Sequence, residues 1–254
     1  MYENYYGLRA NPFTLTPDPD FLFVSGEHRE AIAGLTYAVL TRKGICALIG
    51  DAGTGKTTLL RTVIRAIPQQ RAVFSVVLNP MLTTAEFLRT CVRGFGVDCD
   101  GAKDQLLANF QQFLMQVHQE NRIAVLVIDE AHGLSADVLE EVRLLTNFET
   151  EKEKLLQIIL SGQDELSALL DRHDLRQLKQ RIAVRLHIKP LTRDAVSFYV
   201  QHRWGRVNKA PCPFDTGSLA AIAEVSGGIP RLINSVCDNA LLFASSQGAK
   251  VITT

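Results

Sequence analysis

Short apolar segments alternate with segments of helical spacing over about the first 190 residues. Five of the apolar segments predict strands, at about 44–49, 71–78, 123–128, 155–160 and 184–188. The remaining segments predict helices at about 27–41, 58–68, 84–94, 103–120, 136–147, 164–171 and 174–181. The third strand segment is apolar without interruption, which is typical of a central parallel strand that is covered on both faces. Together these elements predict a three-layer α/β/α core around a parallel five-stranded sheet.

The pattern becomes entirely helical after Pro190. Helices are predicted at about 192–207, 215–225 and 230–246, with Pro211, Pro213 and Gly227-Gly228 between them. The last helix begins with Pro230, and proline is favoured in the first turn of a helix. We therefore expect two domains: an α/β core over residues 1–189, which includes an N-terminal strap, and a small helical lid over residues 190–254.

The residues after the first predicted strand, Gly50-Asp51-Ala52-Gly53-Thr54-Gly55-Lys56-Thr57, fit the P-loop pattern G-x-x-x-x-G-K-[ST] between a strand and a helix. The glycines allow backbone conformations in which N–H groups converge on phosphate oxygens at a helix N-terminus. Lys56 is expected to reach the β- and γ-phosphates of ATP, and the Thr57 hydroxyl to ligate Mg²⁺. The expected nucleotide-binding residues are Gly50, Asp51, Ala52, Gly53, Thr54, Gly55, Lys56, Thr57 and Thr58.

Two carboxylates, Asp129 and Glu130, follow the third predicted strand. In parallel sheets ligands bind beyond the carboxyl ends of the strands, so this position fits a Walker B motif. Asp129 is expected to hold Mg²⁺ and Glu130 to orient and polarise the attacking water. The sequence Asp129-Glu130-Ala131-His132 also spells the DEAH motif of a helicase class. Because no second RecA-like domain is recognisable, we interpret His132 as a local hydrogen-bonding residue.

Three further polar residues are candidates for contact with the nucleotide. Ser161 and Gln163 end the fourth predicted strand, and either can touch the γ-phosphate or the attacking water; the sequence does not separate them. Arg231 lies at the start of the last lid helix and is expected to face the nucleotide.

Residues 172–193 hold seven basic side chains and one acidic one, Asp174. The basic residues are Arg172, Arg176, Lys179, Arg181, Arg185, Lys189 and Arg193. One interpretation is a solvated basic face. The other is that one arginine enters the active site of a neighbouring subunit and stabilises charge on the transferring phosphoryl group, which would couple hydrolysis to homo-oligomer assembly.

The N-terminal 25 residues are rich in proline and aromatic residues, which predicts an irregular segment that packs elsewhere. Two interpretations remain open here. The segment is a strap over the core, or Pro12-Phe13 and their neighbours wall the adenine site.

Composition is ordinary for a globular protein: 254 residues, 46 % hydrophobic and 21 % charged. No apolar run approaches the length that spans a bilayer, and the N-terminus lacks the features of a secretory signal. Five scattered cysteines predict reduced thiols in a cytoplasmic protein.

The net charge of the chain is zero, but it is unevenly distributed: residues 1–171 sum to −7 and residues 172–254 to +7. This asymmetry indicates an anionic partner or packing of acidic against basic faces in an oligomer.

Taken together, these motifs resemble those of the AAA+ ATPases, and within them the ExeA/GspA (general secretion pathway A) family. The resemblance extends from Tyr6-Gly7-Leu8, Pro12-Phe13 and Thr16-Pro17-Asp18-Pro19 at one end to Gly228-Ile229-Pro230-Arg231 at the other. It also includes Ser161-Gly162-Gln163, Gln180-Arg181-Ile182 and Pro190-Leu191-Thr192. It implies a sensor 1 at Ser161 or Gln163, an arginine finger at or near Arg181, and a sensor 2 at Arg231.

Secretion-type members of this family continue beyond the ATPase domain into a membrane span and a peptidoglycan-binding domain. The resemblance implies an ATPase that acts on a protein partner of a secretion or envelope-assembly system, in the bacterial cytoplasm or at the inner face of the membrane. Transposition regulators of the TnsC/MuB kind share the AAA+ core, so an ATP-dependent protein that coats duplex DNA is the alternative. A signalling ATPase is a third hypothesis. The sequence has no basic–aromatic interleaving typical of single-strand binding, and no helix-turn-helix with base-reading residues.

Overall fold

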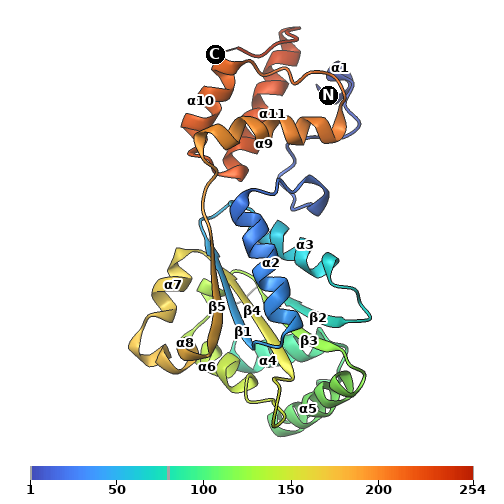
Figure 1. The fold of residues 1–254 in the computed structure, drawn as a ribbon, viewed down its shortest axis with the longest axis vertical. Helices are drawn as coiled ribbons and strands as arrows, with labels where there is room; N and C mark the ends of the chain where they lie inside the picture. The colour runs from blue at the N-terminus through green and yellow to red at the C-terminus, as the bar shows by residue number, and fades with distance from the viewer. Residues whose placement is uncertain (1, 79–80, 254) are drawn as a thin grey trace. The chain divides into compact units, whose positions relative to one another are not determined.

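The computed structural model describes residues 2–78 and 81–253. Its strands form one five-stranded sheet in the order β2-β3-β4-β1-β5 (Figure 1), with every pair parallel. The strands are β1 (Ile45–Gly50), β2 (Ala72–Val77), β3 (Ile123–Ile128), β4 (Leu156–Gly162) and β5 (Ile182–Ile188). The predicted α/β fold with a parallel five-stranded sheet is confirmed.

Apart from α1, which lies in the N-terminal segment predicted to be irregular, the helices lie within a few residues of the predicted segments. In the first part of the chain they are α1 (Tyr2–Tyr6), α2 (Gly26–Leu40), α3 (Lys56–Ala66), α4 (Thr84–Arg93), α5 (Lys103–Gln119), α6 (Ala136–Leu145) and α7 (Asp164–Leu170). After them come α8 (Arg176–Arg181), α9 (Arg193–Val207), α10 (Thr216–Ser226) and α11 (Pro230–Ser246). Three 3₁₀ turns complete the order: η1 (Pro19–Phe21), η2 (Ala131–Gly133) and η3 (His173–Leu175). The single helix predicted over 174–181 is therefore divided between η3 and α8.

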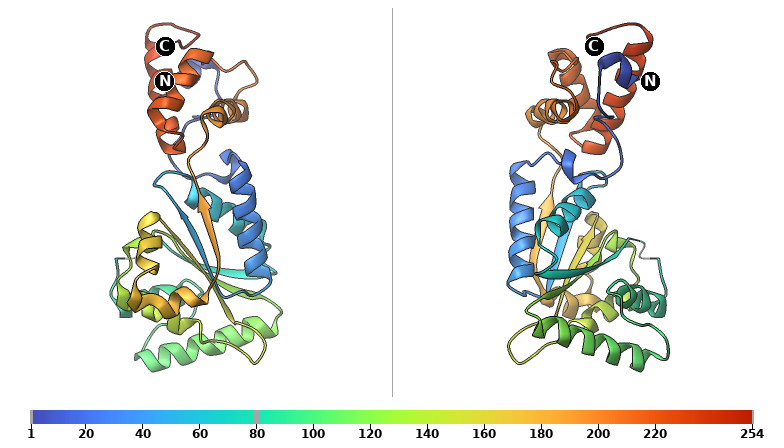
Figure 2. Two further views of the ribbon diagram at one scale, coloured as in Figure 1. Left: turned by 60° about the vertical axis from the view of Figure 1, so that its left-hand side comes forward. Right: turned by 90° about the vertical axis from the view of Figure 1, so that its right-hand side faces the viewer.

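The sheet and its covering helices form one compact unit, residues Glu30–Gly50 and Leu60–Ile188. Alternate residues of β1, such as Ile45, Ala47 and Ile49, pack into a core that also contains side chains of α4 to α8. Figure 2 shows α2, in blue, on the opposite side of the sheet from α7 and α8. Because both faces are covered, all six residues of β3 are buried, which explains the uninterrupted apolar run in the sequence.

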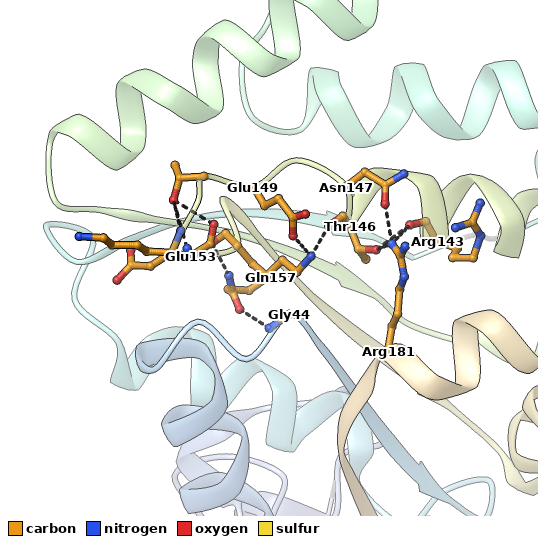
Figure 3. Close-up of polar contacts among 11 residues, drawn as sticks. Gly44, Arg143, Thr146, Asn147, Glu149, Glu153, Gln157 and Arg181 are labelled. Atoms are coloured by element: carbon orange, nitrogen blue, oxygen red, sulfur yellow. Dashed lines mark hydrogen bonds and ion pairs between the residues drawn. The ribbon is translucent and has the colours of Figure 1, made fainter.

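A buried polar residue ties the start of the sheet together. The side chain of Gln157, in β4, accepts a hydrogen bond from the Gly44 amide at 2.7 Å and donates one to the Lys154 carbonyl at 3.0 Å (Figure 3). Both ends of the amide group are therefore satisfied, as burial in a central strand requires.

The second compact unit contains residues up to Arg29, Asp51–Leu59 and the chain from Lys189 onward. The N-terminal segment belongs to this unit, whereas the sequence pattern predicts it to be part of the α/β core. Its Tyr2 and Phe13 are buried in the same core as residues of α9, α10 and α11, and the Phe13 ring meets Phe214 edge-on at 6.1 Å. The buried Arg203 donates hydrogen bonds to the carbonyls of Pro12 at 2.6 Å and Thr14 at 3.1 Å. The proline-rich segment is thus fixed to the C-terminal helices by aromatic packing and by one arginine.

Over residues 2–78 and 81–253, none of the helices combines the length and the apolar character needed to cross a membrane.

Candidate functional site

The P-loop follows β1 directly and leads into α3. A Cβ placed on Gly50 would lie 2.3 Å from the Ile188 carbonyl oxygen, so only glycine fits beside β5 at this position. Gly53 and Gly55 have φ angles of +79° and +99°, in the region that other residues rarely adopt. Lys56 is the first residue of α3, so the loop ends at a helix N-terminus, which favours an anion.

Two buried side chains close the loop on itself. The Lys56 ammonium group donates to the Asp51 carbonyl at 2.9 Å, and the Thr54 hydroxyl donates to the same oxygen at 2.8 Å. Only 5 % of Lys56 and 1 % of Thr54 are exposed. A cationic group is therefore held inside the curve of the loop. Of the other predicted P-loop residues, Asp51 and Ala52 are exposed, and Thr57 and Thr58 lie in the first turn of α3.

The start of α11 packs on the P-loop within the second unit. The Arg231 amide donates to the Gly53 carbonyl at 3.2 Å. A Cβ placed on Gly53 would lie 2.7 Å from the Arg231 Cβ and 3.4 Å from its Cδ. The stem of Arg231 thus lies against the loop while the residue remains exposed, so this predicted residue contacts the P-loop.

His28 also lies against the P-loop, although no sequence motif points to it. Its ring is buried, with 3 % of the residue exposed, and a Cβ placed on Gly55 would lie 3.6 Å from its Nε2. The one signal in the sequence is its position three residues after Ser25, a residue type that commonly caps a helix start. That spacing does not reveal that the ring packs against Gly55.

Asp129 and Ser161 are brought together by strand pairing in the α/β unit. Ile128 pairs with Leu160, so the residues that follow them lie side by side at the carboxyl ends of β3 and β4. The Ser161 hydroxyl donates to Asp129 Oδ1 at 2.8 Å, and the Glu130 amide donates to the same oxygen at 3.1 Å. Asp129 is 4 % exposed and Ser161 is completely buried, so the carboxylate has a fixed orientation.

Glu130 adopts a left-handed backbone conformation, with a φ of 55°, and its side chain is about half exposed. Its carboxylate lies 3.4 Å from the Nδ1 of His132. The Gln163 amide also approaches that Nδ1 at 3.4 Å, and the Gln163 side chain approaches His132 Nε2 at 3.4 Å. The structure therefore separates the two strand-end candidates: Ser161 contacts Asp129, whereas Gln163 contacts His132.

The basic segment is largely engaged within its own chain. The Arg181 guanidinium donates to the Arg143 carbonyl at 3.1 Å, to the Asn147 side chain at 2.7 Å and to the Thr146 hydroxyl, all at the end of α6 (Figure 3). Arg172 pairs with Asp174 at 2.6 Å, and Lys179 pairs with Asp171 at 2.7 Å.

Arg185 lies 3.5 Å from Asp171, at the margin of an ion pair. The exposed side chain of Arg176 has no hydrogen bond or ion pair with any residue that the structure describes; its backbone N–H donates to the His173 carbonyl. Of Arg181 and the two arginines nearest to it in this segment, Arg176 and Arg185, Arg176 is thus the one whose side chain is left unengaged by its own chain.

A P-loop after β1, a paired Asp129 after β3 and C-terminal helices define an AAA-type P-loop protein. The chain matches the AAA domain family over residues 39–170, and it belongs to that family. It is 38 % identical to general secretion pathway protein A of Aeromonas hydrophila over 254 residues, which cover 99 % of this chain and 46 % of that protein. The resemblance predicted from the sequence is thereby confirmed. The chain spans less than half the length of this relative.

Solved structures show the same fold. The ORC2 protein of Aeropyrum pernix, in its ADPNP–ADP complexes, is similar with a TM-score of 0.73 and 17 % identity, covering 97 % of this chain and 70 % of that one. Cdc6p of Pyrobaculum aerophilum is similar with a TM-score of 0.74 and 19 % identity, covering 96 % and 68 %. At these identities the likeness concerns the α/β fold and the C-terminal helices alone.

Proposed function

We propose that this protein is a Mg²⁺-dependent ATPase whose turnover depends on self-assembly. The observation that carries the proposal is the P-loop itself. This one loop combines two glycines with positive φ, a helix N-terminus and a buried ammonium group. A triphosphate fits this arrangement, because amide N–H groups and a cation are the groups that phosphate oxygens need. The ORC2 relative in fold was solved with ADPNP and ADP, which supports the same ligand class.

Each predicted residue has a role in this proposal. Residues 50–58 hold the phosphates, with Lys56 as the cation. Thr57 and Asp129 would hold Mg²⁺, which supplies charge neutralisation on the phosphate oxygens when bound. Glu130 orients and polarises the water, Ser161 fixes the Asp129 carboxylate, and Gln163 links the end of β4 to His132. Arg231 reaches the phosphates from α11.

In this proposal hydrolysis depends on assembly because a neighbouring subunit supplies an arginine to the active site. Arg181 was the choice from the sequence, but its guanidinium is occupied at the end of α6. Arg176 is exposed on the same short helix and is the better candidate on this structure. An arginine in trans would make hydrolysis depend on protein concentration.

We further propose that hydrolysis serves secretion or envelope assembly through a protein partner on the cytoplasmic side. The support is the 38 % identity to general secretion pathway protein A across this chain. The alternative, an ATP-dependent duplex-DNA coat, is favoured by the +7 charge of residues 172–254, although ion pairs engage several of those charges.

The proposal is tested by phosphate release from ATP, with Mg²⁺ and after chelation with EDTA, in the wild type and in Lys56→Ala. Wild-type turnover should require Mg²⁺, and Lys56→Ala should lose productive ATP binding. An exposed lysine distant in sequence from the loop, Lys250→Ala, is the matched control. Equal turnover in wild type and Lys56→Ala would overturn the assignment of the P-loop.

A further inference from the structure

The His28 imidazole lies between a helix cap and the P-loop. Ser25 precedes α2, and its hydroxyl oxygen accepts from the His28 backbone amide at 3.3 Å, as an N-cap serine does for the third residue of a helix. The same hydroxyl lies 2.7 Å from the Nδ1 of the His28 ring. On the other side of the ring, Nε2 faces the P-loop: a Cβ placed on Gly55 would lie 3.6 Å from it, and the Thr54 backbone acts on the ring as a hydrogen-bond acceptor that raises the pKa of His28.

These contacts indicate where the neutral ring carries its hydrogen. The Thr54 backbone raises the pKa of His28, as a carbonyl oxygen that accepts from the imidazole does. Nε2, which faces the loop, then carries the hydrogen, and Nδ1 accepts from the Ser25 hydroxyl. Burial lowers the pKa of His28, which favours this neutral form, while the Thr54 bond and the charge of Glu27 oppose that shift.

The Thr54 carbonyl belongs to the same peptide unit as the Gly55 amide. In a trans peptide the C=O and the N–H point in opposite directions. A bond that holds the Thr54 carbonyl toward His28 therefore turns the Gly55 N–H toward the side of the loop away from His28. Gly55, at φ +99°, has no side chain to restrict this rotation, so the peptide needs an external constraint.

We propose that His28 is a positioning residue for nucleotide binding: it orients the Thr54–Gly55 peptide so that the Gly55 N–H is available to a phosphate oxygen. This inference rests on the proposed nucleotide site. It assigns no role in the chemical step to His28, so the affinity for nucleotide should change more than kcat.

The test uses two substitutions that retain different ends of the imidazole. Glutamine in His28→Gln carries an amide N–H near the position of Nε2, whereas asparagine in His28→Asn reaches only the position of Nδ1. Affinity is measured with a fluorescent N-methylanthraniloyl-ADP, and KM and kcat with ATP. We expect His28→Asn to bind about five- to tenfold more weakly than wild type, the scale of one buried hydrogen bond. His28→Gln should recover most of the affinity.

Equal losses in the two variants, or losses that follow their unfolding temperatures, would assign His28 to packing and overturn the proposal. If His28→Asn does not fold, Ser25→Ala gives a second test, because it keeps the ring but removes the donor to Nδ1. Affinity should then fall about two- to threefold, and unchanged affinity would refute the proton arrangement. Lys56→Ala separates the hypotheses: if the wild type and Lys56→Ala both fail to bind, the nucleotide site itself is wrong. If only Lys56→Ala fails and His28→Asn binds normally, only this inference is wrong.

Discussion

At the scale of single residues, Glu130 is the side chain with the most direct chemical consequence. Its amide is tied to the Asp129 carboxylate, while its own carboxylate is about half exposed and has only the long contact to His132. It is thus a carboxylate on a fixed backbone that remains accessible to water. Glu130→Gln keeps the shape and removes the base, so turnover should fall about 10²- to 10⁴-fold while nucleotide binding is retained.

That prediction is checked by phosphate release and by titration with the fluorescent ADP analogue. Glu165→Gln, an acidic residue on α7 that is exposed, is the matched control. Wild-type turnover in Glu130→Gln would remove this residue from catalysis.

His28 also predicts a dependence of stability on pH. Burial lowers the pKa of His28 in the folded protein, whereas a histidine in an unfolded chain has a pKa of about 6.5. Below that pH the unfolded state binds the proton more readily, so the free energy of unfolding falls as the pH falls. His202, whose pKa is lowered by burial and by Arg206 and Arg203, acts in the same direction.

Thermal unfolding should therefore occur at a lower temperature at pH 5.5 than at pH 7.5, and the difference should be smaller in His28→Gln. The exposed His173, changed to glutamine, is the control for loss of a histidine as such. A pH dependence in His28→Gln as large as in the wild type would contradict the assignment.

At the scale of elements, most of the fold followed from local pattern. Each buried strand is an apolar run, and the start of α11 at Pro230 is as predicted. What local pattern cannot supply is the partner of a side chain. Ser161 and Gln163 were indistinguishable because the choice depends on the pairing of β4 with β3. His28 was missed because its partner, Thr54, is brought to it only by tertiary structure.

Arg181 illustrates the same limit and gives a prediction. Its guanidinium meets acceptors at the C-terminal end of α6, where a cation also interacts favourably with the helix dipole. Arg181→Ala should therefore lower the free energy of unfolding by about 1 kcal/mol and reduce the unfolding temperature.

Arg176→Ala, on the same helix, should leave the unfolding temperature unchanged. If Arg176 acts in trans, its loss should cost about 10³-fold or more in turnover of the assembled protein.

The two arginine variants control for each other in thermal unfolding and in turnover at high protein concentration. The reverse pattern, with Arg181→Ala stable but inactive and Arg176→Ala active, would return the role of finger to Arg181.

At the scale of the whole molecule, the distribution of charge separates the proposed function from its alternative. Residues 172–254 carry a net +7, and two of their basic side chains form direct ion pairs: Arg172 with Asp174, which that sum already includes, and Lys179 with Asp171, which lies outside the range. Exposed ion pairs of this kind are weak, so a duplex DNA could still compete for these side chains. A protein that coats DNA through several phosphate contacts would show an affinity that falls steeply with salt.

The decisive measurement is ATP turnover as a function of protein concentration, with and without duplex DNA, at low and at moderate salt. For the secretion-type proposal we expect turnover per subunit to rise with protein concentration, because an arginine in trans completes each site. Addition of DNA should leave turnover unchanged. Arg176→Ala should remove the rise. If DNA instead stimulates turnover at low protein concentration and the stimulation disappears as salt is raised, the basic residues contact phosphates and the DNA-binding alternative takes precedence. If turnover per subunit is constant over concentration and unaffected by DNA, each subunit is complete by itself, and the assembly-dependent mechanism is refuted.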